Sequence, residues 1–302
     1  MRTLAIVLVS AAACSSPSGE PGAPDAGGPG PGDVAPPDGP GGSAAPRLPA
    51  PTGTCPTIVP GDVTFAPAGI PPRKVKLSFD AAASGPGELV LYWHATGSGT
   101  FEAQYSLGDT ATAIEERGGV IAAPTSDPAA GTFEWFVTQQ NGRQDDFLLA
   151  DEVVACLAQA GRIDARRIHS MGMSAGALQT TALSFVRSSY IASVATYSGG
   201  MPEGYTPDVE DPANKFAALI FDGGTADNVF GVDFNAASER YRAQLAGSGH
   251  YAVVCDHGNG HEIPLDAASS VDMFFTANPY GAWPSPFAAS GLPASFPSYC
   301  PR

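Results

Sequence analysis

The chain has 302 residues, which is enough for one large domain or two small ones. It carries 15 lysines and arginines against 30 aspartates and glutamates, so its formal net charge is -15. An acidic chain is repelled by nucleic acid and by anionic lipid surfaces, so we expect neither as a partner.

Residues 1–14 have the pattern of an export signal. A basic start at Arg2 precedes an apolar run at 4–9, and alanines at 11–13 stand directly before Cys14. The apolar run is too short to span a bilayer. The pattern resembles a bacterial lipoprotein signal, although Ala11 stands where leucine is commonest. Two outcomes stay open: lipidation of Cys14 at the cell envelope, or secretion after cleavage near Cys14.

Residues 15–53 are almost wholly Pro, Gly, Ala, Ser and Asp, and they include no aromatic side chain. Such a segment cannot bury a core, so we expect a disordered tether. The composition becomes globular near Cys55, and we expect residues 54–302 to form one catalytic domain. A membrane would be contacted only through a lipid on Cys14.

Four more cysteines follow Cys14, and an even number in an exported chain suggests up to two disulfides. Sequence alone cannot choose among the three pairings of Cys55, Cys156, Cys255 and Cys300. A bridge from Cys55 to Cys300 is favoured because these two flank the folded part. Cys156 lies on an apolar helical stripe, which also fits a simply buried thiol.

Patterning along the chain predicts strands that alternate with helices. The expected strands are an edge hairpin at 63–65 and 75–79, and then 88–94, 119–123, a short strand before residue 174, 191–197, 216–221 and 251–255. The expected helices are 101–117, 145–160, 175–186, 234–246 and 267–276. This alternation predicts an α/β fold with a mostly parallel sheet and helices on both faces. Only about 18 residues separate the strands at Tyr197 and Phe216, so we expect no large lid.

The motif G-x-S-x-G occurs at Gly172, Ser174 and Gly176, between an apolar run and an alanine-rich helical run. A strained strand-to-helix turn leaves no room for side chains beside the serine, which explains both glycines. The N–H groups at the start of the following helix favour developing negative charge. We therefore interpret Ser174 as a nucleophile; the alternative is an ordinary strand–helix turn.

A nucleophilic serine needs a base, and the base needs an orienting carboxylate. Asp227 follows the strand at 216–221 and His261 follows the strand at 251–255, so the order is Ser, Asp, His. His257 remains an alternative base. Asp222 and Asp233 remain alternative acids, or turn and capping residues.

The region from about residue 88 to 275 resembles the polyhydroxybutyrate depolymerase and feruloyl esterase family of α/β-hydrolases. Its G-x-S-A-G-G motif is matched at 172–177, with Ala177 for the last glycine. Its H-G-T-x-D turn resembles 223–227, where Gly223 replaces the histidine. Its G-H-x-W-P segment resembles 260–264, with Ile263 for tryptophan, and its H-G-C-x oxyanion loop resembles 94–97, with Ala95 for glycine.

The resemblance implies an α/β-hydrolase fold and a Ser174-Asp227-His261 triad. In the expected mechanism the N–H of Ala175, with one from the turn at Ala95 and Thr96, binds the oxyanion. His94 is expected to steady that loop. His169 is expected to be a satisfied core histidine and His250 to be exposed. No group has metal-ligand spacing, so we expect neither a metal nor another cofactor.

Three functions are compatible with these residues. The leading one is a secreted serine carboxylic-ester hydrolase, expected as a monomer. A peptidase or acyltransferase could use the same triad, and a catalytically inactive surface-binding lipoprotein could keep the same fold. An open site suits polymeric or aromatic esters, with Trp135 and Trp283 as candidate rim residues; aromatic side chains at such positions also serve as loop anchors.

Overall fold

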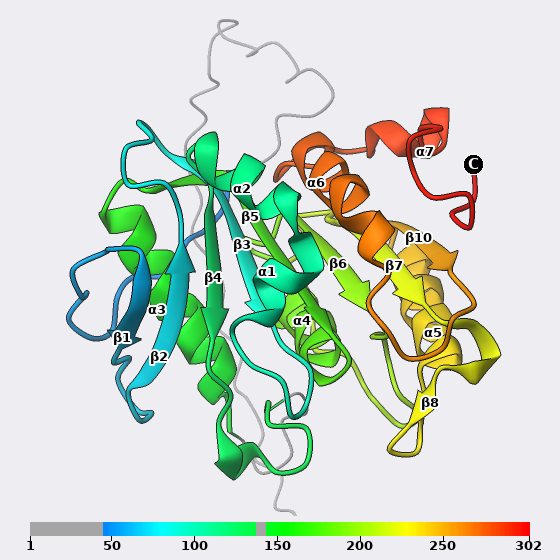
Figure 1. Ribbon diagram of the computed structural model, residues 1–302, viewed down its shortest axis with the longest axis horizontal. Coiled ribbons are helices and arrows are strands. Elements are labelled where there is room, and N and C mark those ends of the chain that lie inside the picture. Colours follow the sequence, from blue (N-terminus) through cyan, green and yellow to red (C-terminus); the bar gives the residue numbers. More distant parts are fainter. Residues whose placement is uncertain (1–44, 137–142) are drawn as a thin grey trace, which may run out of the picture. The chain divides into compact units, whose positions relative to one another are not determined.

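The computed structural model describes residues 45–136 and 143–302, and its centre is an eight-stranded sheet (Figure 1). The strands are β1 (Gly61–Phe65), β2 (Arg73–Ser78), β3 (Gly87–Trp93), β4 (Val120–Pro124), β5 (Ile163–Met173), β6 (Ser193–Tyr197), β7 (Ala217–Asp222) and β10 (Tyr251–Asp256). Their order is β1-β2-β4-β3-β5-β6-β7-β10. Strand β2 runs antiparallel to both neighbours, and all other pairs are parallel. The prediction of a mostly parallel sheet with an edge hairpin is confirmed.

Helices cover both faces of the sheet (Figure 1). One face packs against α3 (Asp145–Gln159), α4 (Ala175–Val186) and α5 (Phe234–Gly247), and the other against α1 (Glu102–Leu107), α2 (Asp109–Glu116), α6 (Ala268–Ala277) and α7 (Pro286–Ser290). Successive side chains of a strand point to opposite faces of the sheet, and this alternation produces two cores. In β3, Leu89, Leu91 and Trp93 enter the first core, while Val90 and Tyr92 enter the second.

The prediction of a single helix at 101–117 is wrong in one respect: the structure has two helices, α1 and α2, with a break at Gly108. Gly108 has φ = 51° and ψ = -132°, a conformation open to glycine but strained for other residues. Across the break, Ala103 and Leu107 of α1 and Ala111 and Ile114 of α2 are still buried in the same core.

Short elements connect the larger ones. They are the 3₁₀ turns η1 (Pro128–Ala130), η2 (Gly224–Ala226) and η3 (Leu265–Ala267), and the small hairpin of β8 (Asn228–Val229) with β9 (Val232–Asp233). Residues 198–216 form neither helix nor strand. The loops after β5, β7 and β10 therefore meet at the carboxyl edge of the sheet without a helical cover from this segment.

The disulfides differ from the favoured pairing. Cys55 is joined to Cys156 and Cys255 to Cys300. Cys55 lies beside α3 at the first core, whereas Cys300 is buried in the second core, so the sheet separates them. The expectation of a Cys55–Cys300 bridge is wrong because the two ends of the folded region lie on opposite faces of the sheet.

The first described residues contact the domain directly. The Arg47 N–H donates to the Ser189 carbonyl at 2.9 Å, just before β6 and thus at the amino edge of the sheet. Farther on, the buried Glu152 of α3 accepts from the N–H groups of Thr52 (2.7 Å) and Gly53 (2.9 Å). Contacts with the domain thus start before the expected boundary at residue 54. The predicted export signal, Cys14 and residues 15–44 of the predicted tether lie outside the described residues.

Within the described residues, no helix has both the length and the apolar character needed to cross a membrane.

Candidate active site

Ser174 lies at the sharp turn between β5 and α4. Its φ of 56° and ψ of -119° are strained for a residue with a side chain. The flanking glycines are required sterically: a Cβ on Gly172 would lie 2.4 Å from the Trp93 carbonyl oxygen, and one on Gly176 only 1.8 Å from the same atom. The start of α4 is thus pressed against the end of β3, as the G-x-S-x-G pattern predicts.

The structure brings together Ser174, His261 and Asp227. The hydroxyl of Ser174 lies 2.9 Å from Nε2 of His261, and Nδ1 of His261 lies 2.7 Å from Oδ1 of Asp227. Ser174 is 6% exposed and Asp227 1%, while the His261 side chain keeps 19% of its surface open. The imidazole ring packs on Phe234 at the start of α5, with ring centroids 4.8 Å apart.

Asp227 is held as a carboxylate by three donors. Oδ2 accepts from the Ser198 hydroxyl (2.7 Å) and the Gly223 N–H (3.0 Å), and Oδ1 accepts from His261. Burial alone would raise the pKa of Asp227, but the hydrogen bonds from His261, Ser198 and Gly223 outweigh it and lower that pKa below its usual value. Asp227 is thus charged at neutral pH and fixes the proton of His261 on Nδ1.

Ser198 was not among the residues predicted from the sequence. It directly follows β6, has φ = 51°, and contacts the reacting groups only through Asp227. Its place at the carboxyl end of a parallel strand was the available signal.

The alternative acids have structural roles. Asp222 accepts from the Gly224 N–H (2.8 Å) and from Asn235 (2.9 Å), and burial raises its pKa. Asp233 caps α5 by accepting from the Ala236 N–H at 2.9 Å. Neither contacts His261.

The alternative base, His257, is turned away from the serine. Its Nδ1 accepts from the Asn259 N–H at 3.3 Å, and its ring lies toward Tyr299. The loop then reverses at Gly260, whose carbonyl oxygen would lie 1.9 Å from a Cβ on Gly223. This close approach leaves no room for a side chain at Gly223, and the reversal of the loop brings His261 toward Ser174.

Of the two N–H groups of the predicted oxyanion loop, at Ala95 and Thr96, one is already engaged. The Ala95 N–H donates to Oε1 of the buried Glu102 at 3.0 Å, so the expectation that Ala95 contributes is wrong. The N–H groups of Thr96 and Ala175 have no hydrogen-bond partner within the described part of the chain. Glu102 also accepts from the Tyr92 hydroxyl at 3.1 Å, which ties α1 to the end of β3. Glu102, like Ser198, belongs to no motif and is not predicted from the sequence.

A second loop supports the first. The indole N–H of Trp135 donates to the His94 carbonyl at 2.8 Å, and the two rings lie 4.9 Å apart. His94 is buried and its Nδ1 lies 2.8 Å from the Ala95 carbonyl oxygen, in keeping with the expected supporting role. Trp135 is only 1% exposed, so its prediction as a substrate rim is wrong; it anchors the loop instead.

Trp283 is also misplaced for a rim. It is 45% exposed, but it lies shortly after Tyr280, whose N–H donates to the Arg166 carbonyl at 2.7 Å. Arg166 belongs to the beginning of β5, so Trp283 lies toward the amino edge of the sheet, opposite Ser174.

Two further histidines lie in the interior. His169 is completely buried, stacks on Phe275 at 4.5 Å and has Nδ1 2.9 Å from the Ser193 hydroxyl. Its Nε2 has no partner within the described residues. His250, expected to be exposed, is buried and contacts Glu210 and the Phe216 carbonyl, because the chain packs it beneath the loop before β7.

Few potential metal ligands lie close together in the part of the chain that the structure describes. Only Cys55, Glu152 and Cys156 bring three candidate ligand atoms together, and the two sulfurs are joined in a disulfide. That group therefore has no thiolates to offer.

No family model matches the sequence, and no curated protein matches it. Solved structures do match. One described as sOPH has a TM-score of 0.65 at 15% identity, over 84% of this chain and 96% of that chain. A thermostable esterase has a TM-score of 0.56 at 15% identity, over 72% and 62%. The S-formylglutathione hydrolase of Agrobacterium tumefaciens has 0.52 at 11% identity, over 71% and 90%. With a serine elbow after β5, and Asp227 and His261 after β7 and β10, the chain has an α/β-hydrolase fold.

Proposed function

We propose that the chain is a serine hydrolase that cleaves carboxylic esters through an acyl-enzyme. One observation carries the proposal: the continuous hydrogen-bonded relay from Asp227 through His261 to Ser174, at a strained elbow. A structural role for these residues would require neither the strain nor the alignment. Esterase and hydrolase neighbours of the same fold support it.

The reaction follows from the positions of the groups. His261 Nε2 takes the hydroxyl proton as Ser174 Oγ bonds to the ester carbonyl carbon, and the charged Asp227 stabilises the imidazolium. The N–H groups of Ala175 and Thr96 donate to the oxyanion. When the ester bond breaks, His261 returns the proton to the leaving alcohol. Water, deprotonated by His261, then releases the acid and regenerates Ser174.

The resemblance in the motifs supports a substrate of the kind that polyhydroxybutyrate depolymerases and feruloyl esterases cleave. The absence of a helix in residues 198–216 supports access for a bulky or polymeric ester. A panel of hydroxybutyrate oligomers, feruloyl esters, acetylated sugars and short p-nitrophenyl esters ranks these classes by kcat/KM.

We propose that the protein is exported and lipidated at Cys14, and acts as a monomer. The pairing of the other four cysteines supports export, because disulfides persist in oxidising compartments. Mass spectrometry of the mature N-terminus is expected to show a diacyl or triacyl Cys14. An unmodified terminus, or one that starts elsewhere, contradicts lipidation.

The decisive experiment labels the nucleophile. A fluorophosphonate probe is expected to modify Ser174 alone, and Ser174→Ala is expected to lose both labelling and ester turnover by a factor approaching about 10⁶. Ser290→Ala, which removes an exposed hydroxyl on α7, serves as the matched control. Labelling elsewhere, or a Ser174→Ala protein with a tenth of wild-type turnover, contradicts the assignment.

A further inference from the structure

The predicted oxyanion loop, residues 94–97, starts in backbone contact with the nucleophile elbow. A Cβ on Gly176, two residues after Ser174, would lie 1.8 Å from the Trp93 carbonyl oxygen and 2.7 Å from that of His94. The end of β3 and the first residue of the loop therefore lie against the start of α4. A change in the course of the loop shifts its N–H groups relative to Ser174.

Two carboxylates hold the N–H groups on either side of the free one in this loop. The Ala95 N–H donates to Oε1 of Glu102 at 3.0 Å, and the Gly97 N–H donates to Oε2 of Glu134 at 3.3 Å. Within the described residues, the Thr96 N–H between them has no partner. The loop thus leaves one donor of these three open.

The direction of the Thr96 N–H is set by the carbonyl of the same peptide unit. Because a trans peptide is planar, this N–H points away from the Ala95 carbonyl oxygen. That oxygen accepts from the Ser98 N–H at 3.0 Å and lies 2.8 Å from Nδ1 of His94. Rotation of the peptide unit would disrupt both contacts.

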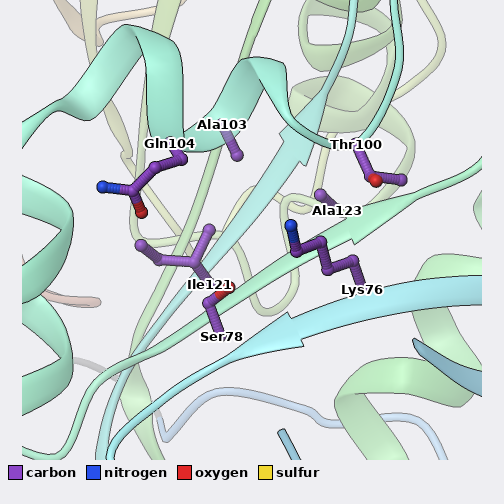
Figure 2. A pocket seen from close by; sticks show the side chains of 7 residues that line it. All are labelled: Lys76, Ser78, Thr100, Ala103, Gln104, Ile121 and Ala123. Carbon is purple, nitrogen blue, oxygen red and sulfur yellow. The ribbon is translucent and has the colours of Figure 1, made fainter. Parts of the chain in front are cut away.

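Glu102 connects the loop to the helix that follows it. It is buried, it is the first residue of α1, and its Oε1 also accepts from the Tyr92 hydroxyl at 3.1 Å. Figure 2 shows a cavity of about 70 Å³ between α1 and strands β2 and β4, with Ala103 and Gln104 of the helix in its lining. Packing on these strands therefore does not fix α1 alone, and the hydrogen bonds of Glu102 set its distance from the loop.

Glu134 holds the loop from the other side. Its φ of 62° is uncommon for a residue other than glycine. Consecutive side chains of an extended chain point to opposite sides, whereas here Glu134 and Trp135 both reach the same loop, at Gly97 and at the His94 carbonyl. The strained turn at Glu134 thus serves the contact with the loop.

We propose that Glu102 and Glu134 are positioning residues, which hold the loop so that only its Thr96 N–H is presented to the oxyanion. The inference rests on the proposed ester hydrolysis at Ser174. Because the hydrogen bond from Thr96 strengthens as negative charge develops on the substrate oxygen, loss of its alignment lowers kcat and leaves KM nearly unchanged.

Removal of each acceptor tests the proposal in p-nitrophenyl acetate turnover. Glu102→Ala is expected to lower kcat by about 10²-fold, the scale of losing one oxyanion donor, with KM changed by less than about threefold. Glu102→Gln keeps an oxygen that accepts from Ala95 and Tyr92, so its kcat is expected within about fivefold of the wild type. Glu134→Ala is expected to lower kcat by about two- to tenfold.

Glu116→Ala is the matched control, because it removes an exposed glutamate of the neighbouring helix α2. It is expected to leave kcat and KM unchanged. Equal losses of kcat in Glu102→Gln and Glu102→Ala, or wild-type kcat in either alanine variant, overturn the proposal. If Glu102→Ala does not fold, Glu134→Ala decides by the same criterion.

Amide hydrogen exchange separates this proposal from the catalytic one, because it needs no turnover. The Ala95 and Gly97 N–H groups are expected to exchange more slowly than that of Thr96, and Glu102→Ala is expected to accelerate exchange at Ala95 by at least about tenfold. If the wild type hydrolyses no ester but shows this pattern, ester hydrolysis fails and the two carboxylates still hold the loop. If esters are hydrolysed while Ala95 and Gly97 exchange as fast as Thr96, the loop assignment fails alone.

Discussion

Replacement of Gly176 by alanine tests how closely α4 must approach β3. Gly176 is the second residue of α4, where alanine would ordinarily favour the helix by about 1 kcal/mol. Here, however, a Cβ would lie 1.8 Å from the carbonyl oxygen of Trp93 and 2.7 Å from that of His94. Both neighbours are backbone atoms, so no side chain can rotate away.

The magnitude follows from this geometry. Contacts of Cβ atoms below 3.0 Å essentially do not occur, so the start of α4 must move from the end of β3 by about 1 Å. Overpacking of this kind costs about 1–3 kcal/mol of unfolding free energy. The same shift moves the Ala175 N–H relative to Thr96, and a 1 Å misplacement in a catalytic site costs about 10²-fold in rate. We expect Gly176→Ala to lower both stability and kcat, the latter by about 10²-fold.

The assay pairs urea denaturation with p-nitrophenyl acetate turnover. Gly247→Ala at the end of α5 is the matched control, because a Cβ there meets nothing within 4 Å. It is expected to raise stability slightly, by up to about 1 kcal/mol, and to leave kcat unchanged. A Gly176→Ala protein that is as stable and as active as the wild type would refute the close-approach argument.

Three further predictions concern the base, a disulfide and a buried histidine. His261→Ala is expected to lower kcat by at least about 10³, and His257→Ala by less than about tenfold, in stopped assays of ester turnover; the reverse order contradicts the assignment of the base. Replacing Cys55 and Cys156 by alanine opens a link across 101 residues and should lower the unfolding free energy by about 2–5 kcal/mol in urea titrations; unchanged stability contradicts the predicted contribution of the bridge. Burial, assisted by Arg167 and Arg117, lowers the pKa of His169 to about 3. Because the unfolded chain then binds a proton that the folded chain does not, His169 should reduce stability as pH falls from about 6.5 to 3, by roughly 1.4 kcal/mol per pH unit. A pH series of urea midpoints should show a shallower slope for His169→Gln, and equal slopes contradict the prediction.

The sheet and the three residues of the relay were accessible to sequence reasoning for local reasons. The periodicity of strands and helices can be recognised from residues that are close together in the sequence. The carboxyl ends of parallel strands lie at one edge of the sheet. Glycines at 172 and 176 mark the elbow because backbone atoms of β3 occupy the space of their side chains. The approach of Ser174, Asp227 and His261 follows from these short-range rules.

Features that depend on packing between distant parts of the chain could not be predicted from the sequence. The pairing of Cys55 with Cys156 depends on which face of the sheet the chain reaches. Trp135 has the composition of a rim residue, and only the position of the His94 carbonyl makes it an anchor. Ala95 and Thr96 are equivalent in the sequence motif, and the distant carboxylate of Glu102 distinguishes their N–H groups.

The way the chain joins the domain also decides how a mechanical load would be carried. A pull on the chain before Arg47 first meets its backbone hydrogen bond to Ser189 at the amino edge of the sheet. The load next reaches the hydrogen bonds that Glu152 accepts, and is then stopped by the covalent link between Cys55 and Cys156. That link passes the force into α3, whereas the relay of Ser174 lies at the opposite edge. The domain can thus be held under tension by its leading segment while the reacting groups keep their spacing.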